Sequence, residues 1–281
     1  MSPLVVPAAV CYHRAMDGVA RAHAVAARTV PIYHALGDLA FVYGQGSVVA
    51  GLATDADLDL ICVWDRDEPP AVVERPLHRL HTGTASAAQF DRPGFVLDQF
   101  WLGRQQVDVA HVSRSTFDGW LTTVGAGGGW EHRAYPQPLA AVAGFAYGVL
   151  LADDSGGGGA ARARVATVPQ ALAERSRAHL AAHLAAYAAA LAGCAARGDG
   201  WLFHEILADA LRPALVAWFA TRGHYLPFHK RLHLWIARFA LDPALADLER
   251  RLWLPDAALA DKEARYRLLA ERILALPHTF Q

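Results

Sequence analysis

The chain has 281 residues, of which 54% are hydrophobic, and its formal net charge is −1. This length is ample for one large domain or two medium ones. The near-zero net charge excludes a global field that would draw the protein to nucleic acid or to an anionic membrane.

Cysteine use and apolar segments bear on the cellular compartment. Cys11, Cys62 and Cys194 show neither metal-ligand spacing nor a disulfide framework, which favours a reducing compartment. Residues 1–7 lack the charged segment and long apolar core of a signal peptide. The alanine-rich run 178–196 is interrupted by polar side chains and is too weakly hydrophobic to predict a membrane span. We therefore expect a soluble, cytoplasmic protein with no membrane partner.

The first residues predict a helix followed by a strand. Apolar side chains recur at helical spacing over 11–36, and Pro31 is expected to interrupt that helix or to start a new turn. The short apolar run 39–43 predicts a buried strand that ends at a glycine. Residues 44–47 then predict a tight turn.

A second strand is predicted over 58–64, where apolar and acidic residues alternate. Asp57 and Asp59 are two positions apart, so the period of a strand places both carboxylates on the same side. A helix is expected over 71–80, although Pro76 falls inside it.

A hairpin is predicted next in the chain. Apolar runs at 95–102 and 105–112 flank the turn residues Gly103 and Arg104. Asp108 falls on the returning strand, which brings a third carboxylate into the same region of the fold.

The second half of the chain has helical segments and few strand signals. The glycine tract 156–159 predicts a surface loop or hinge. We expect an α+β domain at 1–155, with a mixed sheet and flanking helices, and an all-helical bundle at 160–281. The active site is expected in the cleft between them. The bundle's helices are predicted over 170–196, 200–222, 228–240, 243–253 and 257–275.

The three carboxylates have the pattern of a divalent-metal site. Asp57 and Asp59 would share one face of a strand, and Asp108 would join them from a neighbouring strand. Carboxylate oxygens are the hard ligands that Mg²⁺ prefers, and two such ions about 3.5–4 Å apart serve many phosphate-transfer enzymes. An Asp-x-Asp pair alone has roughly one chance in ten of being catalytic, but the whole combination is far more specific.

Gly46 and Ser47 predict the phosphate-binding half of the site. A glycine lets the backbone approach phosphates closely, and N–H groups at a turn or helix start bind anions. The Ser47 hydroxyl adds a donor. Asp108 is the candidate to deprotonate an acceptor hydroxyl, because it would lie beside the metal.

Together these segments resemble the polymerase-β-like nucleotidyltransferase superfamily, and in particular its aminoglycoside nucleotidyltransferases with a C-terminal helical domain. The resemblance rests on Gly46-Ser47, Asp57-Leu58-Asp59 and Val107-Asp108-Val109, and it covers residues 41–113. It implies transfer of a nucleoside monophosphate, AMP from ATP or the equivalent from another nucleoside triphosphate, to a hydroxyl group, with release of pyrophosphate.

The resemblance also implies a role for each site residue. Asp57 and Asp59 would hold Mg²⁺, with two ions expected. Asp108 would complete the metal site, act as the base, or do both. Ser47 would contact the terminal phosphates.

The chain departs from this family immediately after the Gly-Ser pair. Many relatives carry arginine there, whereas this chain has Val48-Val49-Ala50. Arg104, Lys230 and Arg231 are candidates to meet the phosphate charge instead. Lys230 ends a Tyr-x-Pro-x-x-Lys stretch similar to a recurring feature of the family's helical domains, and its ammonium group could reach the triphosphate as a point charge. A solvated lysine at a helix start is an equally good interpretation.

Several acceptors fit such a reaction. A small hydroxylated molecule such as an aminoglycoside is expected first, because of the appended helical domain. A protein hydroxyl, as in antitoxin-type nucleotidyltransferases, is the alternative. A nucleic-acid 3′ end is disfavoured by the charge of the chain. A non-catalytic nucleotide-binding module is the rival from another class, and the presence of all three carboxylates disfavours it.

Overall fold

A computed structural model describes residues 8–54, 56–71, 73–75 and 86–277 of the chain. The side chains of residues 8–17 and 86–91 are not among those described. Most of the helix expected over 71–80 lies outside the described residues.

The chain forms two compact units, and it passes between them three times. The segment 122–143 leaves the sheet-containing unit early, and the chain then returns to that unit before it finally leaves it. The domains expected from the sequence were 1–155 and 160–281, which would place the segment 122–143 in the first domain. The first unit comprises Met1–Leu121 and Gly144–Ala166, and the second comprises Thr122–Ala143 and Thr167–Gln281.

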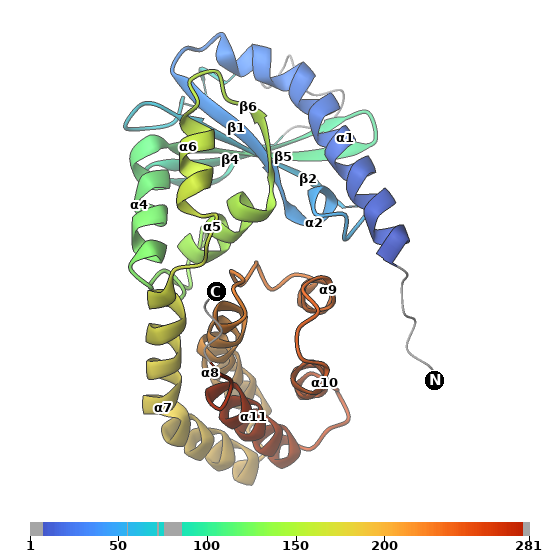
Figure 1. Cartoon of the computed structure of the whole chain (residues 1–281), viewed down its shortest axis with the longest axis vertical. Coiled ribbons are helices and arrows are strands. Elements are labelled where there is room, and N and C mark those ends of the chain that lie inside the picture. The colour runs from blue at the N-terminus through green and yellow to red at the C-terminus, as the bar shows by residue number, and fades with distance from the viewer. Residues whose placement is uncertain (1–7, 55, 72, 76–85, 278–281) are drawn as a thin grey trace. The chain divides into compact units, whose positions relative to one another are not determined.

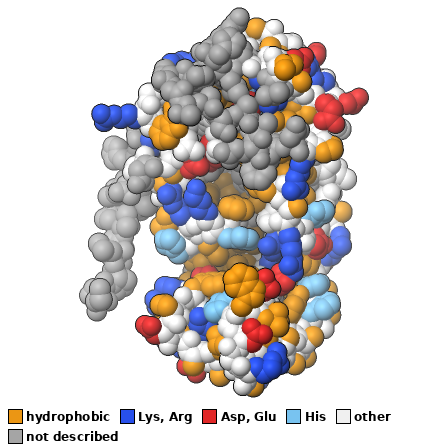
Figure 2. All heavy atoms as spheres, turned by 180° about the vertical axis from the view of Figure 1, so that it is seen from behind, with side chains coloured by type: hydrophobic (Ala, Val, Ile, Leu, Met, Phe, Trp, Pro, Cys, Tyr) orange, Lys and Arg blue, Asp and Glu red, His pale blue; other side chains and the backbone are white. Residues whose placement is uncertain are grey.

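Charged side chains of both signs are interspersed on the molecular face that Figure 2 shows. This mixture agrees with 26 Lys and Arg residues against 27 Asp and Glu residues in the sequence.

The first unit is built on a mixed six-stranded sheet with the order β3-β4-β5-β2-β1-β6. β2 and β5 are parallel, and every other neighbouring pair is antiparallel (Figure 1). The predicted hairpin is β4–β5, with the expected two-residue turn. β3 and β6 were not predicted. The strands are β1 (Leu39–Gln45), β2 (Leu58–Trp64), β3 (Ser86–Arg92), β4 (Phe95–Leu102), β5 (Gln105–Ser113) and β6 (Val149–Ala152).

Helices cover both faces of this sheet, which makes it an α+β unit as expected. On one face, Ala22 and Tyr33 of α1 pack against Val42 and Leu60 of the sheet. On the other face, an aromatic cluster joins Phe41 and Tyr43 of β1 to residues of α4 and α5. The helices of this part of the chain are α1 (Ala8–His34), α2 (Gly46–Val49), α4 (Arg114–Gly125), α5 (Pro138–Tyr147) and α6 (Gly157–Arg164).

The helix α1 continues through Pro31, where an interruption or a new turn was expected. The helix continues to His34, and the carbonyl of Pro31 accepts a hydrogen bond from the Ala35 N–H at 3.2 Å. A proline inside a helix removes one backbone donor. Tyr33 is fully buried, with its ring in edge contact with those of Trp64 and His111, so tertiary packing holds the last turn in place.

The glycine tract also differs from its prediction as a loop or hinge. Gly157 begins α6, and the carboxylate of Asp153 accepts the N–H groups of Gly158 at 2.9 Å and Gly159 at 2.7 Å. An acidic side chain that caps the first turn stabilises a helix whose glycines would otherwise disfavour it.

The second unit is helical, as expected. Asp199 and Asp242 cap the starts of α8 and α10 by accepting backbone N–H groups, and α7 packs against α8 and α11. α9 is shorter than its predicted range because Leu226 to Arg231 form a non-helical connection. Its helices are α7 (Gln170–Arg197), α8 (Gly200–Thr221), α9 (Leu232–Arg238), α10 (Pro243–Leu252) and α11 (Leu259–Leu274).

Among the described residues, α7 is the one helix whose length and apolar composition would allow it to cross a membrane. A core helix of a soluble protein can pass the same test, so α7 by itself is weak evidence for a membrane span.

Candidate metal and nucleotide site

Three carboxylates meet at one end of the sheet in the first unit. Asp59 lies on β2 directly opposite Asp108 on the parallel strand β5, and Asp57 lies just before β2 begins. One ligand oxygen from each carboxylate lies within 4.8 Å of the other two. The structure thus brings together the three residues that the sequence singled out, in a group that could hold a metal ion.

Polar side chains extend this group into a row across four strands. Gln45 of β1 pairs with Asp59, Asp59 pairs with Asp108, and Asp108 pairs with Gln99 of β4. Residues paired directly across neighbouring strands point to the same face of a sheet. The carboxylates therefore share the face that carries the aromatic cluster, and they lie where β2 begins.

Two amides hold the Asp108 carboxylate in place. Gln99 Nε2 donates to Asp108 Oδ2 at 3.0 Å, and Gln106 Nε2 donates to Asp108 Oδ1 at 3.2 Å. Asp108 itself is only 9% exposed, and these two donors help to fix its orientation. Neither glutamine was predicted from the sequence to be part of the site. A two-residue turn sets the register of a hairpin, so the predicted turn already placed residue 99 opposite residue 108.

Gly46 lies against the carboxylate of Asp59. Its φ is +85°, and a Cβ atom at this position would collide with Asp59 Oδ2. No other residue type could occupy position 46 without moving that carboxylate. Instead of the predicted tight turn, β1 continues to Gln45 and α2 begins at Gly46. Ser47 follows in α2, and its carbonyl accepts the N–H of Leu52 at 2.7 Å.

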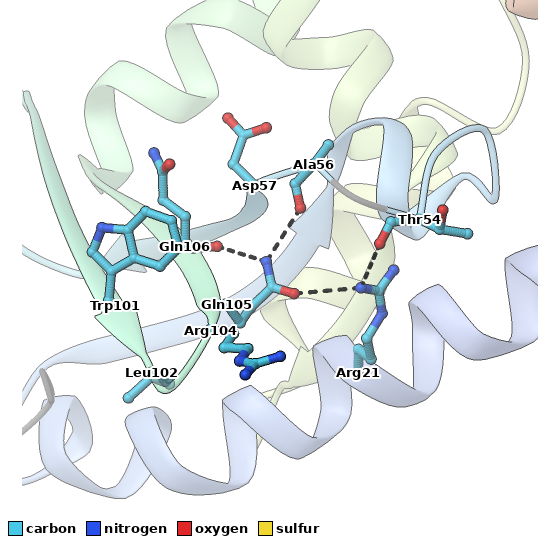
Figure 3. Close-up of a pocket in the computed structure, with 9 residues that line it drawn as sticks. All are labelled: Arg21, Thr54, Ala56, Asp57, Trp101, Leu102, Arg104, Gln105 and Gln106. Atoms are coloured by element: carbon cyan, nitrogen blue, oxygen red, sulfur yellow. Dashed lines mark hydrogen bonds between the residues drawn. The ribbon is translucent and has the colours of Figure 1, made fainter. Parts of the chain in front are cut away.

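The loop that carries Asp57 is held by the amide of a third glutamine. Gln105 Nε2 donates to the carbonyl of Ala56 at 3.2 Å. Arg21 Nη1 donates to the carbonyl of Thr54 at 2.8 Å and contacts Gln105 Oε1 at 3.4 Å (Figure 3). The loop is therefore tied both to α1 and to the β4–β5 hairpin, which sets where Asp57 emerges.

The remaining predicted phosphate ligands lie in different places. Arg104 occupies the exposed turn between β4 and β5, in the same unit as the carboxylates. Lys230 lies in the second unit, exposed, in the turn before α9, and Arg231 next to it has a φ of 62°. The role of Lys230 at a triphosphate stays a prediction, as does the cleft expected between the domains.

A buried polar network occupies the opposite face of the sheet. Arg75 Nε lies 2.7 Å from Asp98 Oδ2, and His111 Nε2 lies 3.2 Å from the same oxygen. Trp64 Nε1 donates to His111 Nδ1 at 3.2 Å. These four side chains are almost fully buried, so the network is part of the core and has no access to a ligand.

Burial governs how this network and its neighbour Cys62 ionise. Burial lowers the pKa of His111, although the Asp98 carboxylate opposes that shift. Burial alone would raise the pKa of Asp98, but the hydrogen bond from His111 and the positive charge of Arg75 outweigh it and lower that pKa. Burial also raises the pKa of the Cys62 thiol, so this side chain acts as a small hydrophobic residue of the core.

The likeness of this chain to known proteins lies at the level of structure. No family model and no curated protein sequence matches the chain. The structure is similar to that of a nucleotidyltransferase-like protein from Exiguobacterium sibiricum, with 13% sequence identity and a TM-score of 0.45. That similarity covers 90% of this chain and 74% of the other. Because both values are low, this likeness does not define the activity of the chain.

Proposed function

We propose that this protein is a Mg²⁺-dependent nucleotidyltransferase of the polymerase-β-like type. The observation that carries the proposal is the meeting of Asp57, Asp59 and Asp108, whose ligand atoms lie within 4.8 Å of one another. A glycine packed against one carboxylate and two amides that donate to another support it, because these contacts constrain the positions of the carboxylate oxygens.

The donor set fits magnesium. All three side chains offer hard carboxylate oxygens, and there is no sulfur or imidazole in the group, which suits Mg²⁺ better than zinc or copper. Asp57 and Asp59 would hold the ions, with Asp108 completing the set, and two ions are proposed. When bound, such ions neutralise the phosphates and polarise the phosphorus under attack.

The residues of the chain supply position and a proton acceptor. In the proposed reaction the acceptor hydroxyl oxygen bonds to the α-phosphorus of the triphosphate. The bond from that phosphorus to the β-phosphate oxygen breaks, and pyrophosphate leaves with the electron pair. The hydroxyl proton passes to the carboxylate of Asp108. The amides of Gln99 and Gln106 keep this carboxylate aimed, so the contribution of the site is mostly positioning and charge.

The nucleotide is assigned to the β1–α2 side of the carboxylates. Gly46 borders Asp59 there, and the Ser47 hydroxyl is proposed as a donor to the terminal phosphates. Lys230 is proposed as an additional cation for the triphosphate. ATP is the first candidate for the nucleotide, and other nucleoside triphosphates follow it.

The proposed acceptor is a small hydroxylated molecule, and an aminoglycoside is the example that the family resemblance suggests. A protein hydroxyl is the alternative acceptor. A non-catalytic nucleotide-binding module is the rival function, and the intact carboxylate group argues against it.

Transfer can be tested directly with α-labelled nucleoside triphosphates, MgCl₂, a panel of hydroxylated small molecules and a fraction of cellular protein. We expect label to move to a small molecule, and label on a protein band would identify the alternative acceptor. Asp57→Asn should reduce transfer by more than about 100-fold, because it removes a metal ligand. Asp154→Asn, a matched change at an exposed carboxylate outside the site, should leave transfer unchanged. Failure to bind any triphosphate with Mg²⁺ present would refute the proposal.

A further inference from the structure

A pocket of about 560 Å³ opens beside Asp57 in the first unit. This volume is in the range of small-molecule sites. Its walls come from α1, from the loop before β2 and from the end of the β4–β5 hairpin (Figure 3). Its lining includes Arg21, Asp57, Trp101, Arg104, Gln105 and Gln106.

The charge of the lining is predominantly positive. It contains the guanidinium groups of Arg21 and Arg104, and its one acidic side chain is Asp57. The carboxylate of Asp57 belongs to the metal group, so a bound cation would neutralise it. Arg104 is exposed, and no carboxylate pairs with it among the described residues. A guanidinium group in this position binds a carboxylate or phosphate well.

The pocket also has an aromatic wall, the indole ring of Trp101. Trp101 pairs with Gln106 across the hairpin and is 41% exposed, so part of its indole ring faces the pocket. In Figure 3 the Asp57 carboxylate and the Gln106 amide point to one side of Gln105, and the Arg104 guanidinium lies on the other. The ring of a ligand could therefore stack on the indole while its substituents reach Asp57 on one side and Arg104 on the other.

The pocket and the Gly-Ser pair lie at different places beside the carboxylates. Gly46 borders Asp59 at the edge shared by β1 and β2, whereas the pocket is lined by α1, the loop before β2 and the β4–β5 hairpin, and it includes neither Gly46 nor Ser47. In the row Gln45, Asp59, Asp108, Gln99, the first residue lies on β1 and the last on β4 of this hairpin. If the triphosphate lies beside Gly46 and Ser47, the pocket is left for the molecule that receives the nucleotide.

We propose that this pocket binds the acceptor, and that the acceptor is a ring compound with a hydroxyl group and a carboxylate or phosphate group. Its hydroxyl points to Asp57, its ring stacks on Trp101 and its acidic group pairs with Arg104. This inference rests on the proposed function and narrows its acceptor. A polycation such as an aminoglycoside meets charge of the wrong sign here, so the pocket selects against it.

Binding can be measured without nucleotide by ligand-observed NMR titration of the full chain with matched pairs of probes. 4-Hydroxybenzoate is compared with 4-hydroxybenzamide, and glucose 6-phosphate with glucose, so that each pair differs in its acidic group. We expect the acidic member to bind at least about fivefold more tightly in one of the pairs, which tells a carboxylate from a phosphate. Equal binding within both pairs, or no binding, overturns the inference.

Charge reversal at single residues identifies which side chain causes the preference for the acidic probe. Arg104→Glu should remove the preference for the acidic probe, and Trp101→Ala should weaken both members of the preferred pair. Arg28→Glu places the same charge change on an exposed position of α1 outside the pocket, and it should leave the preference intact. An unchanged preference in Arg104→Glu, or displacement of the probe by a non-hydrolysable ATP analogue, assigns the acidic group elsewhere and overturns the inference.

Transfer assays separate this inference from the proposed function. If kanamycin is modified and Arg104→Glu lowers its KM, the protein is a nucleotidyltransferase but the pocket assignment is wrong. If no transfer occurs with any acceptor while the Arg104-dependent preference holds, the pocket is an acid-binding site and the proposed function fails.

Discussion

At the scale of single residues, the candidate site depends on a position with no side chain. Gly46 has a positive φ and lies where a Cβ would strike Asp59. Two separate demands, one on the backbone and one on space, thus fall on the same residue. The packing of Gly46 against a carboxylate, rather than against a hydrophobic side chain, is what connects this glycine to the metal site.

Gly46→Ala should therefore damage metal binding as well as stability. The positive φ costs about 1–2 kcal/mol for any residue with a Cβ, and the collision displaces Asp59 in addition. Gly37→Ala is the matched control, since Gly37 has a φ of +78° and open space around it. Both variants should lose similar free energy of unfolding, but calorimetric titration with Mn²⁺ should weaken in Gly46→Ala alone. Equal metal affinity in the two variants would show that Asp59 does not bind the metal.

The amide of Gln99 is expected to act on the metal through Asp108. It donates to Asp108 Oδ2 at 3.0 Å, and outer hydrogen bonds of this kind orient a ligand before the metal arrives. Gln99→Leu should lower Mn²⁺ affinity about 10–100-fold and leave the circular dichroism spectrum unchanged. Gln170→Leu, at an exposed position on α7, controls for the loss of an amide. Unaltered affinity in Gln99→Leu would mean that Asp108 is held by other contacts.

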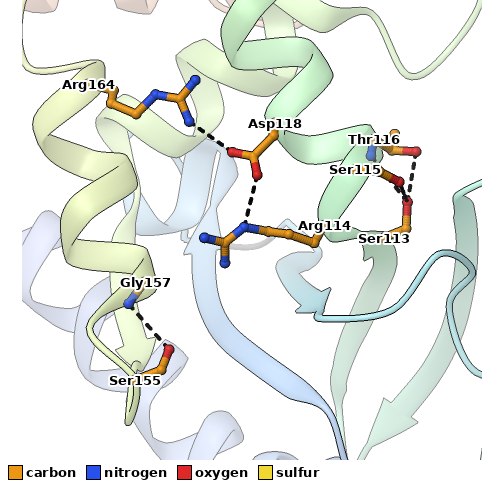
Figure 4. A network of polar contacts seen from close by, with 8 residues as sticks. All are labelled: Ser113, Arg114, Ser115, Thr116, Asp118, Ser155, Gly157 and Arg164. Carbon is orange, nitrogen blue, oxygen red and sulfur yellow. Dashed lines mark hydrogen bonds and ion pairs between the residues drawn. The ribbon is translucent and has the colours of Figure 1, made fainter.

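At the scale of elements, polar side chains at strand and helix ends fix the segments that position the site. α6 begins in a glycine tract because Asp153 accepts two backbone N–H groups there. The same helix is linked to α4 through Asp118, which accepts from Arg114 at 3.0 Å and from Arg164 at 2.9 Å (Figure 4). The side chains of the two Asp118 ion pairs are a third to a half exposed, so solvent weakens these pairs. The cap that Asp153 provides for α6 therefore contributes more stability than the ion pairs.

Asp153→Ala should destabilise the protein by about 1 kcal/mol, the usual cost of a lost helix cap. Urea unfolding followed by circular dichroism measures this loss. Asp154→Ala removes the neighbouring carboxylate, which is exposed and contacts only His34 among the described side chains, and it should change the stability little. If both variants are equally stable, the glycine tract folds as a helix without its cap.

At the scale of the whole molecule, the buried network of Asp98, His111 and Arg75 makes stability depend on pH. The pKa of His111 is lowered by burial, so between its ordinary value and the lowered one the unfolded chain binds a proton that the folded protein does not. The free energy of unfolding must then fall as the pH falls below about 6.5, the ordinary histidine pKa. The lowered pKa of Asp98 adds a further loss below about 4, its ordinary range.

Urea unfolding between pH 8 and pH 5 tests this dependence, and proton NMR of the imidazole groups identifies the source. We expect stability to decrease steadily below pH 6.5 while His111 remains neutral in the folded protein. Burial also lowers the pKa of His179, His224 and His229, so they act in the same direction. A stability that stays constant or rises on acidification would contradict the ionisation state assigned to His111.

Much of the fold followed from local patterns. The β4–β5 hairpin and four of the five long helical ranges of the second unit came from apolar spacing and turn residues, because those signals act within a few residues of each other. The continuation of α1 through Pro31 could not be predicted in this way. It depends on the burial of Tyr33 against Trp64 and His111, which are distant in sequence.

By itself, the sequence determined which three carboxylates are candidates for a metal site, since their strand spacing and order are local features. Only the tertiary structure decided that they meet, because the distance between Asp59 and Asp108 is set by the parallel pairing of β2 with β5. The same holds for the supports of the site. Gly46 packed on Asp59, the amides on Asp108 and the arginine-lined pocket beside Asp57 arise from segments that are brought together only when the sheet forms.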